Sequence, residues 1–88
     1  MISIYIGRRD LASELHERLK KGIVGFTYRT KSGRVVKAIG TRNLNIARSI
    51  GFVIDDPKSG VHRPNCYYDL AKRGWRGYIP QNIIRIDG

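Results

Sequence analysis

The sequence predicts an α+β domain that is mainly β: an N-terminal strand and helix followed by a small five-stranded antiparallel barrel. Three observations lead to this class. Apolar residues alternate with a period of two through most of the chain, one segment shows helical spacing instead, and tight turns separate the alternating segments. With 88 residues, the chain has room for a single domain over residues 1–88 and for a small core.

The N-terminal segment is expected to form a strand and a helix. Apolar residues alternate over Ile2–Ile6, which predicts an extra strand within residues 1–9. Asp10 can cap a helix over residues 10–22, in which leucines recur every four residues and draw one apolar stripe. We expect Gly22 to end this helix.

The barrel is expected over residues 23–86, and it begins with a hairpin. Alternation over Ile23–Arg29 predicts its first strand, Gly33 can supply the positive φ of the turn, and residues 35–41 form the second strand. The inward face of this second strand has two alternatives, Val35 with Ile39 or Val36 with Ala38.

The middle of the chain has a mixed pattern. Residues Thr41–Ser49 could form a loop or a single helical turn, whereas alternation over Ile50–Ile54 predicts a third strand. The segment Asp55–Asn65 contains Pro, Gly and Asp, so we expect a long exposed loop. Long loops in small domains often carry function.

Two aromatic strands surround a basic turn near the C-terminus, and Ile83–Ile86 is expected to close the barrel. Loops of two or four residues both place Asp69 opposite Arg76 and Tyr67 opposite Tyr78, on the outer face. This register gives Arg76 a structural role first. The opposite face, which we expect to be core, pairs Leu70 with Trp75 and Tyr68 with Gly77.

The charge of the chain indicates a polyanionic partner. Seventeen Lys and Arg stand against seven Asp and Glu, for a formal net charge of +10, and Arg18–Ile54 contains nine cations and no acid. A field of this sign attracts polyanions. No apolar run approaches the roughly 20 residues that span a bilayer, so we expect a cytoplasmic protein with no membrane partner.

No arrangement of residues indicates catalysis, a metal ion or another cofactor. The possible ligands His62, Cys66, Asp55 and Asp56 are spread along a loop, and His16 is isolated on the helix. Adjacent aspartates point apart, and no Gly-rich phosphate loop precedes a helix. We therefore expect a non-enzymatic protein without a cofactor.

Five motifs occur in a characteristic order: Phe26–Arg34, Ala38–Thr41, Tyr68–Leu70, Trp75–Tyr78 and Asn82–Ile84. Their order over residues 11–86 resembles the second WYL-type family, small phage and plasmid proteins with an Sm-like, SH3-like β-barrel. The resemblance implies this barrel fold and a phage or other mobile-element source.

The resemblance also implies a sensing role. WYL domains are regarded as ligand- or nucleic-acid-sensing modules that use several arginines of this segment, and Arg76 matches one of them. Ile79 and Asn82 stand where the larger WYL domains tend to carry further arginines. A small anionic ligand such as a nucleotide at Arg76 is therefore one functional alternative.

The leading expectation is a small basic phage-type protein that binds nucleic acid, RNA or DNA and mainly single-stranded, through its cationic hairpins. Another alternative is a phage effector in the host cytoplasm that binds and modulates an acidic host protein through the Asp55–Asn65 loop. Edge strands could also join copies into an oligomer. The residues expected to contact nucleic acid are Arg29, Lys31, Arg34, Lys37, Arg42, Lys72, Arg73, Tyr67 and Tyr78.

Overall fold

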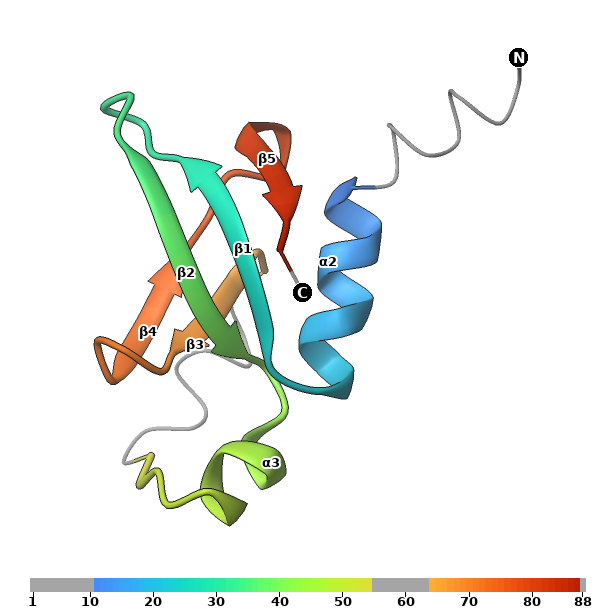
Figure 1. Ribbon diagram of the computed structural model, residues 1–88, viewed down its shortest axis with the longest axis vertical. Helices are drawn as coiled ribbons and strands as arrows, with labels where there is room; N and C mark the ends of the chain where they lie inside the picture. Colours follow the sequence, from blue (N-terminus) through green and yellow to red (C-terminus); the bar gives the residue numbers. More distant parts are fainter. Residues whose placement is uncertain (1–10, 55–63, 88) are drawn as a thin grey trace.

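A computed structural model describes residues 11–54 and 64–87 of the chain. The strand expected within residues 1–9 and most of the expected long loop, residues 55–63, lie outside these ranges. Figure 1 shows the arrangement of the described elements. In chain order they are α2 (Leu11–Lys21), β1 (Val24–Arg29), β2 (Val35–Thr41), α3 (Leu44–Ser49), β3 (Cys66–Asp69), β4 (Gly74–Gly77), the 3₁₀ turn η1 (Pro80–Asn82) and β5 (Ile83–Ile86).

Five antiparallel strands form one bent sheet in the order β4-β3-β2-β1-β5 (Figure 1). The sheet is not closed, so β4 and β5 are its two edges, and the short turn η1 connects them along the chain. The predicted fold class, a helix followed by a small five-stranded antiparallel barrel, is confirmed, and the barrel is an open one.

Helix α2 covers one side of the sheet because its leucines form a single stripe. Leu15 and Leu19 are fully buried, and the helix packs against β1, β2 and β5. On its solvent face Glu14 and Arg18 form an ion pair at 2.7 Å, an i,i+4 arrangement that contributes about 0.3–0.5 kcal/mol. The opposite side of the sheet, on the left in Figure 1, is not covered by α2.

The first hairpin follows the prediction. Gly33 has a φ angle of 92° in its turn, a conformation that only glycine adopts without strain. The inward face of β2 is now defined: Val36 and Ala38 lie opposite the aromatic residues of β1 and pack into the core. Val35 and Ile39 point outward and are 51% and 46% exposed.

The predicted third strand over Ile50–Ile54 is wrong. Helix α3 precedes this segment, and the side chain of Asn43 caps it by accepting a hydrogen bond from the backbone amide of Ile46 at 3.2 Å. Gly51, with a φ angle of 101°, follows the helix and turns the chain. Phe52 and Ile54 then pack in a loop. Alternation had predicted six strands over residues 23–86, one more than the five strands of the barrel, and Ile50–Ile54 is the segment that does not form a strand.

The C-terminal hairpin has a register two residues away from the predicted one. Tyr67 pairs with Arg76, because the loop between the strands consists of Leu70–Arg73. The carboxylate of Asp69 accepts a hydrogen bond from the backbone amide of Lys72 at 2.9 Å and so stabilises this four-residue loop. The predicted pairs are therefore wrong: Asp69 with Arg76, Tyr67 with Tyr78, Leu70 with Trp75, and Tyr68 with Gly77.

The assignment of core and outer faces in this hairpin is also corrected. Tyr67 is fully buried in the main core, whereas Tyr68 packs in a second, smaller cluster beside α3. The ring of Tyr67 lies against Gly40 of β2, so the glycine covered by an aromatic side chain is Gly40 and not Gly77. Because β3 is buried on both faces, its alternation could not indicate which face belongs to the main core.

Candidate functional site

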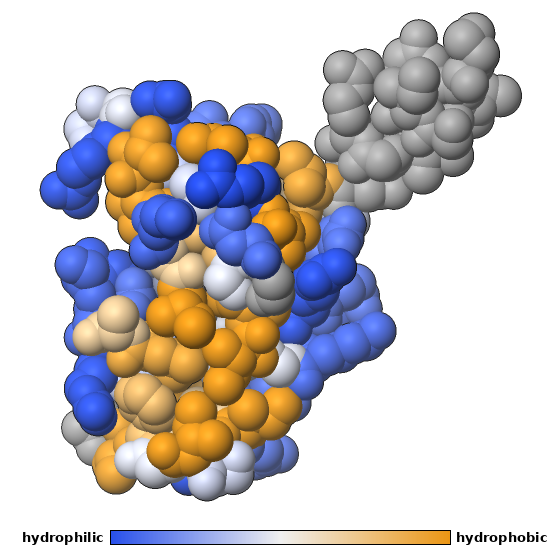
Figure 2. Space-filling model, viewed as in Figure 1, coloured by the Kyte–Doolittle hydropathy of each residue, from blue (hydrophilic) through white to orange (hydrophobic). Residues whose placement is uncertain are grey.

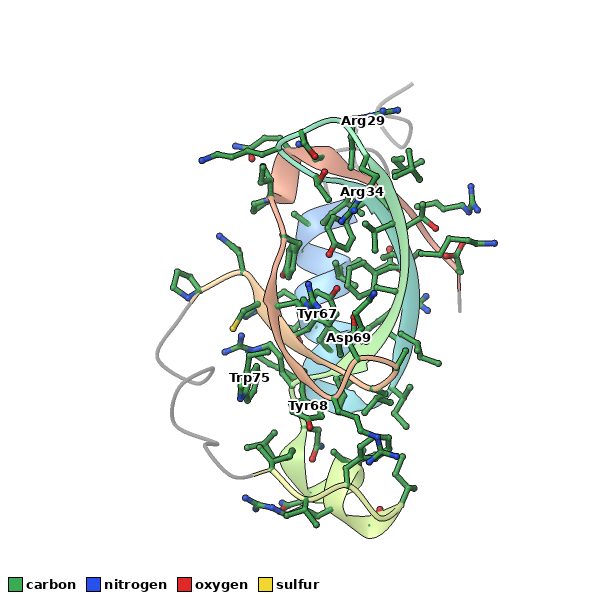
Figure 3. All side chains as sticks on the ribbon, turned by 90° about the vertical axis from the view of Figure 1, so that its left-hand side faces the viewer. Arg29, Arg34, Tyr67, Tyr68, Asp69 and Trp75 are labelled. Atoms are coloured by element: carbon green, nitrogen blue, oxygen red, sulfur yellow. The ribbon has the colours of Figure 1, made fainter. Side chains whose placement is uncertain are left out.

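A groove of about 750 Å³ lies between the β1–β2 hairpin and the β3–β4 hairpin. It is on the side that faces the reader in Figure 3, away from helix α2. Tyr28, Val36, Asp69, Tyr78 and Ile79 contribute to its walls. We call it the cationic groove because six Lys and Arg residues from the two hairpins line it: Arg29, Lys31, Arg34, Lys37, Lys72 and Arg76.

The groove exists because β2 and β3 pair over only a short distance. Their register contains two pairs, Gly40 with Asp69 and Thr41 with Tyr68, extended by one hydrogen bond from the amide of Leu70. Beyond this seam the N-terminal half of β2 pairs with β1 alone. The side of β2 that faces β4 therefore stays open, and the groove occupies this space.

The first hairpin supplies four of the six cations: Arg29 ends β1, Lys31 and Arg34 lie between the strands, and Lys37 lies on β2. A guanidinium nitrogen of Arg29, Nη1, donates to the carbonyl oxygen of Gly33 at 2.9 Å. The backbone amide of Arg34 donates to Oγ1 of Thr30 at 3.1 Å. These bonds order the turn, while the four cationic side chains themselves remain exposed. Figure 3 shows Arg29 and Arg34 at the upper end of the groove.

The second hairpin supplies the remaining two cations. Lys72 lies in the loop that the Asp69 carboxylate stabilises, and Arg76 lies on β4, opposite Tyr67. Both cationic side chains are exposed. Asp69 itself is only 3% exposed, and its carboxylate is engaged by the loop amide of Lys72, so one acidic group stands beside six cations at the groove.

Among the described residues the groove cations form no close ion pair, although Lys37 acts electrostatically on the carboxylate of Asp87. Within residues 11–54 and 64–87, the ion pairs lie on α2 and at the end of β5, and none involves a groove cation. Hydrophilic side chains gather along the left edge of the molecule in Figure 2, where the groove opens, while the centre of that view is apolar. The groove is therefore a concentrated site of positive potential.

Buried aromatic side chains lie beneath the groove. The hydroxyl groups of Tyr28 and Tyr67 are hydrogen-bonded to each other at 2.9 Å, and both rings pack on Phe26. Burial, followed by the hydrogen bond to Tyr28, raises the pKa of Tyr67 well above its usual value. Burial also raises the pKa of Tyr78. Both phenols are therefore neutral around neutral pH and belong to the core.

Two predicted contact residues are thus wrongly placed by the sequence analysis. Tyr67 was expected on the outer face, but it is fully buried and does not line the groove. Tyr78 does line the groove, yet it is only 7% exposed and its ring packs against Phe26. Neither ring offers a free face on which a base could stack.

Two predicted cations lie outside the groove. Nη1 of Arg42 donates to the carbonyl oxygen of Cys66 at 2.8 Å and lies 3.1 Å from its Sγ atom, so this side chain holds β3 to the end of β2. The guanidinium of Arg73 lies 4.8 Å from the centroid of the Phe52 ring, a cation–π contact beside the second cluster. The structure therefore gives Arg42 and Arg73 contacts within the protein.

Sequence reasoning missed several parts of the groove. Asp69 had been assigned to a cross-strand pair with Arg76, and Asn65, Gly77 and Ile79 had no predicted role at the site, although all four line it. For Asp69 a signal was present, because an aspartate at the start of a turn often bonds a backbone amide further along. The others become neighbours only through the fold.

The described part of the chain shows neither a metal-binding cluster nor a membrane-spanning helix. In this part, no three His, Cys, Asp or Glu residues are grouped so that they could hold a metal ion. No helix there has the length and apolar character required to cross a bilayer.

The fold and the groove define a small open β-barrel of the class that acts as a binding or regulatory module. The particular family is shown by sequence comparison. The WYL_2 family model, described as an Sm-like SH3 β-barrel fold, matches residues 12–84, so the chain belongs to this family, as the motif order had indicated. No curated protein and no solved structure matches the chain significantly.

Proposed function

We propose that this protein is a non-enzymatic nucleic-acid-binding module that holds a single strand of RNA or DNA in the cationic groove. One observation carries the proposal: six cations from two hairpins, far apart in the sequence, line one groove in which no described carboxylate pairs with them. Cations in this arrangement neutralise phosphates and release their counterions, which drives binding to nucleic acid.

The shape of the groove supports a single strand as the ligand. A volume of about 750 Å³ between two hairpins can receive a short stretch of one strand, and small barrels bind single strands along such cationic grooves. A phage-type regulatory role in the host cytoplasm, which the family resemblance implies, belongs to the same proposal.

Fluorescence anisotropy with labelled single-stranded RNA, single-stranded DNA and duplex of equal length tests this proposal. We expect both single strands to bind more tightly than the duplex at about 100 mM salt. Six phosphate contacts on a single strand predict a slope of log K against log salt near −4, or roughly a 300-fold loss between 50 and 200 mM salt. If neither single-stranded RNA nor single-stranded DNA binds, the proposal is refuted.

A matched pair of lysine variants separates the groove from the general charge of the protein. Lys31→Ala removes a cation that lines the groove, whereas Lys21→Ala removes an exposed cation at the end of α2, which does not line it. We expect Lys31→Ala to weaken binding and to reduce the salt slope by about 0.7. Equal effects of the two substitutions would show that the groove is not the binding site.

A small anionic ligand is a second candidate, favoured by the position of Arg76 among the groove cations. The volume of the groove lies within the range of about 300–1,000 Å³ that is typical of small-molecule sites. ATP would then raise the melting temperature of the wild-type protein, and Arg76→Ala would abolish this shift without unfolding the protein. A shift that survives Arg76→Ala would contradict a nucleotide site at this residue.

An acidic host protein is the alternative partner that the same positive surface could attract. A pull-down from host lysate, treated with nuclease, distinguishes the two classes. A protein partner stays bound after nuclease treatment, whereas a complex bridged by nucleic acid is lost. Sedimentation of the isolated protein measures whether it also forms the oligomer that its edge strands allow.

A further inference from the structure

The lining of the cationic groove is rich in groups that bind phosphate and poor in groups that bind bases. Its aromatic residues, Tyr28 and Tyr78, are only 5% and 7% exposed. Both rings pack against Phe26, with centroid separations of 5.6 and 6.0 Å. Stacking of a base requires an open ring face, and neither residue presents one to the groove.

Among the neutral polar side chains of the lining, those of Tyr28 and Thr30 are engaged within the protein, whereas the amide of Asn65 is exposed. The hydroxyl of Tyr28 is bonded to that of Tyr67, and the hydroxyl of Thr30 is bonded to Ser32 Oγ and to the backbone amide of Arg34. Asp69 is buried and accepts the loop amide. Reading a base requires groups that can bond its edges, and besides the cations the groove offers chiefly the single amide of Asn65, which is little for sequence recognition.

The partly exposed aromatic residues lie elsewhere. Side chains alternate along β4, so Trp75 points to the face opposite that of Arg76 and packs edge-on against Tyr68. Phe52 is covered by the guanidinium of Arg73. Neither Trp75 nor Phe52 lines the cationic groove, so within residues 11–54 and 64–87 a nucleic-acid strand lying in the groove finds no aromatic stacking platform beside it.

We propose that the single strand binds with its sugar–phosphate backbone in the groove and its bases directed outward, so that affinity is nearly independent of base sequence. This inference rests on the proposed function and deepens it by naming the part of the nucleic acid that the site recognises. The cations contact phosphates, which are the same in every strand.

An abasic oligonucleotide provides the direct test. Anisotropy at about 100 mM salt compares the wild-type protein with labelled oligothymidine and with a deoxyribose-phosphate strand of equal length that lacks bases. We expect the two affinities to agree within about threefold, because a single stacked base alone would contribute roughly 5- to 150-fold. A larger loss for the abasic strand would overturn the inference while leaving the proposed function intact.

Two further measurements make the result specific to the groove. Lys31→Ala must weaken binding of the abasic strand as much as binding of oligothymidine, whereas Lys21→Ala must leave both nearly unchanged. If Lys31→Ala affects oligothymidine alone, the abasic strand binds elsewhere and the inference is wrong. If neither strand binds the wild-type protein, the proposed function itself fails and the inference fails with it.

Discussion

Replacement of Gly40 by alanine should strongly destabilise the protein, although the added group is a single methyl. The new Cβ atom would lie 2.5 Å from Cδ2 of Tyr67 and 2.6 Å from the carbonyl oxygen of Tyr68, whereas carbon atoms pack comfortably at about 3.5–4.0 Å. One obstacle is a fully buried ring and the other is backbone, so the β2–β3 seam itself must separate.

The size of this effect follows from overpacking, which typically costs about 1–3 kcal/mol. A backbone obstacle places Gly40→Ala at the upper end, about 3 kcal/mol, against a total free energy of unfolding of roughly 4–13 kcal/mol for a chain of this length. In a domain of this size each kcal/mol lowers the melting temperature by about 4–8 °C. We therefore expect a decrease of roughly 12–24 °C.

Thermal unfolding monitored by circular dichroism measures this change, with Gly74→Ala as the matched control. A Cβ atom at Gly74 meets no other atom within 4 Å, and Gly74 does not have a positive φ angle. This control should therefore leave stability unchanged or raise it by about 0.4–1 kcal/mol. A melting temperature for Gly40→Ala within about 3 °C of the wild type would refute the packing argument.

Three other predictions concern single hydrogen-bonded groups. The hydroxyl of Thr27 donates to the carboxylate of Asp87 at 2.8 Å, and this bond, with a second one from Arg85, holds the pKa of Asp87 below its usual 3.8. The ionised carboxylate therefore stabilises the folded protein above about pH 4, and this stabilisation is lost as the pH falls further. Asp87→Asn should accordingly melt below the wild type at pH 7 but not at pH 2, and a constant difference would exclude this origin. Tyr67→Phe leaves the buried hydroxyl of Tyr28 without its hydrogen-bond partner and should lower the free energy of unfolding, measured in urea, by about 1–2 kcal/mol. An unchanged urea midpoint would contradict the role of this bond. Asn43→Ala removes the side-chain cap of α3 and should lower the free energy of unfolding by about 1 kcal/mol, again measured in urea. Asn43→Ser, which keeps a capping oxygen, should retain most of this stability.

The parts of the fold that the sequence predicted correctly are those with burial mainly on one side. In β1, alternation and the glycine at position 33 were sufficient, because Val24, Phe26 and Tyr28 of one face pack into the core, whereas Thr27 is the buried residue of the opposite face. β3 is buried on both faces, so its pattern did not define the register. At Ile50–Ile54 a loop places Ile54 in the core beside α3 and partly buries Phe52, which imitates the period of a strand.

The candidate site was predicted in part for a related reason. Cations next to tight turns are exposed wherever the turn projects, so Arg29, Lys31 and Lys72 could be proposed from local sequence. Charge alone does not reveal whether a guanidinium is engaged inside the protein, as those of Arg42 and Arg73 are. That the two hairpins share one groove depends on the strand order, which local patterns do not contain.

The short β2–β3 seam also has a mechanical consequence. The two walls of the groove are separate hairpins joined along one side by two residue pairs, so we expect the seam to act as a hinge about which the walls open and close. A barrel closed along the whole of β2 would be more rigid, but side chains would fill its interior. The absence of further β2–β3 pairing thus makes the barrel less rigid, and at the same time it gives a nucleic-acid strand access to the groove. Hydrogen exchange at the seam amides should therefore slow when a strand occupies the groove.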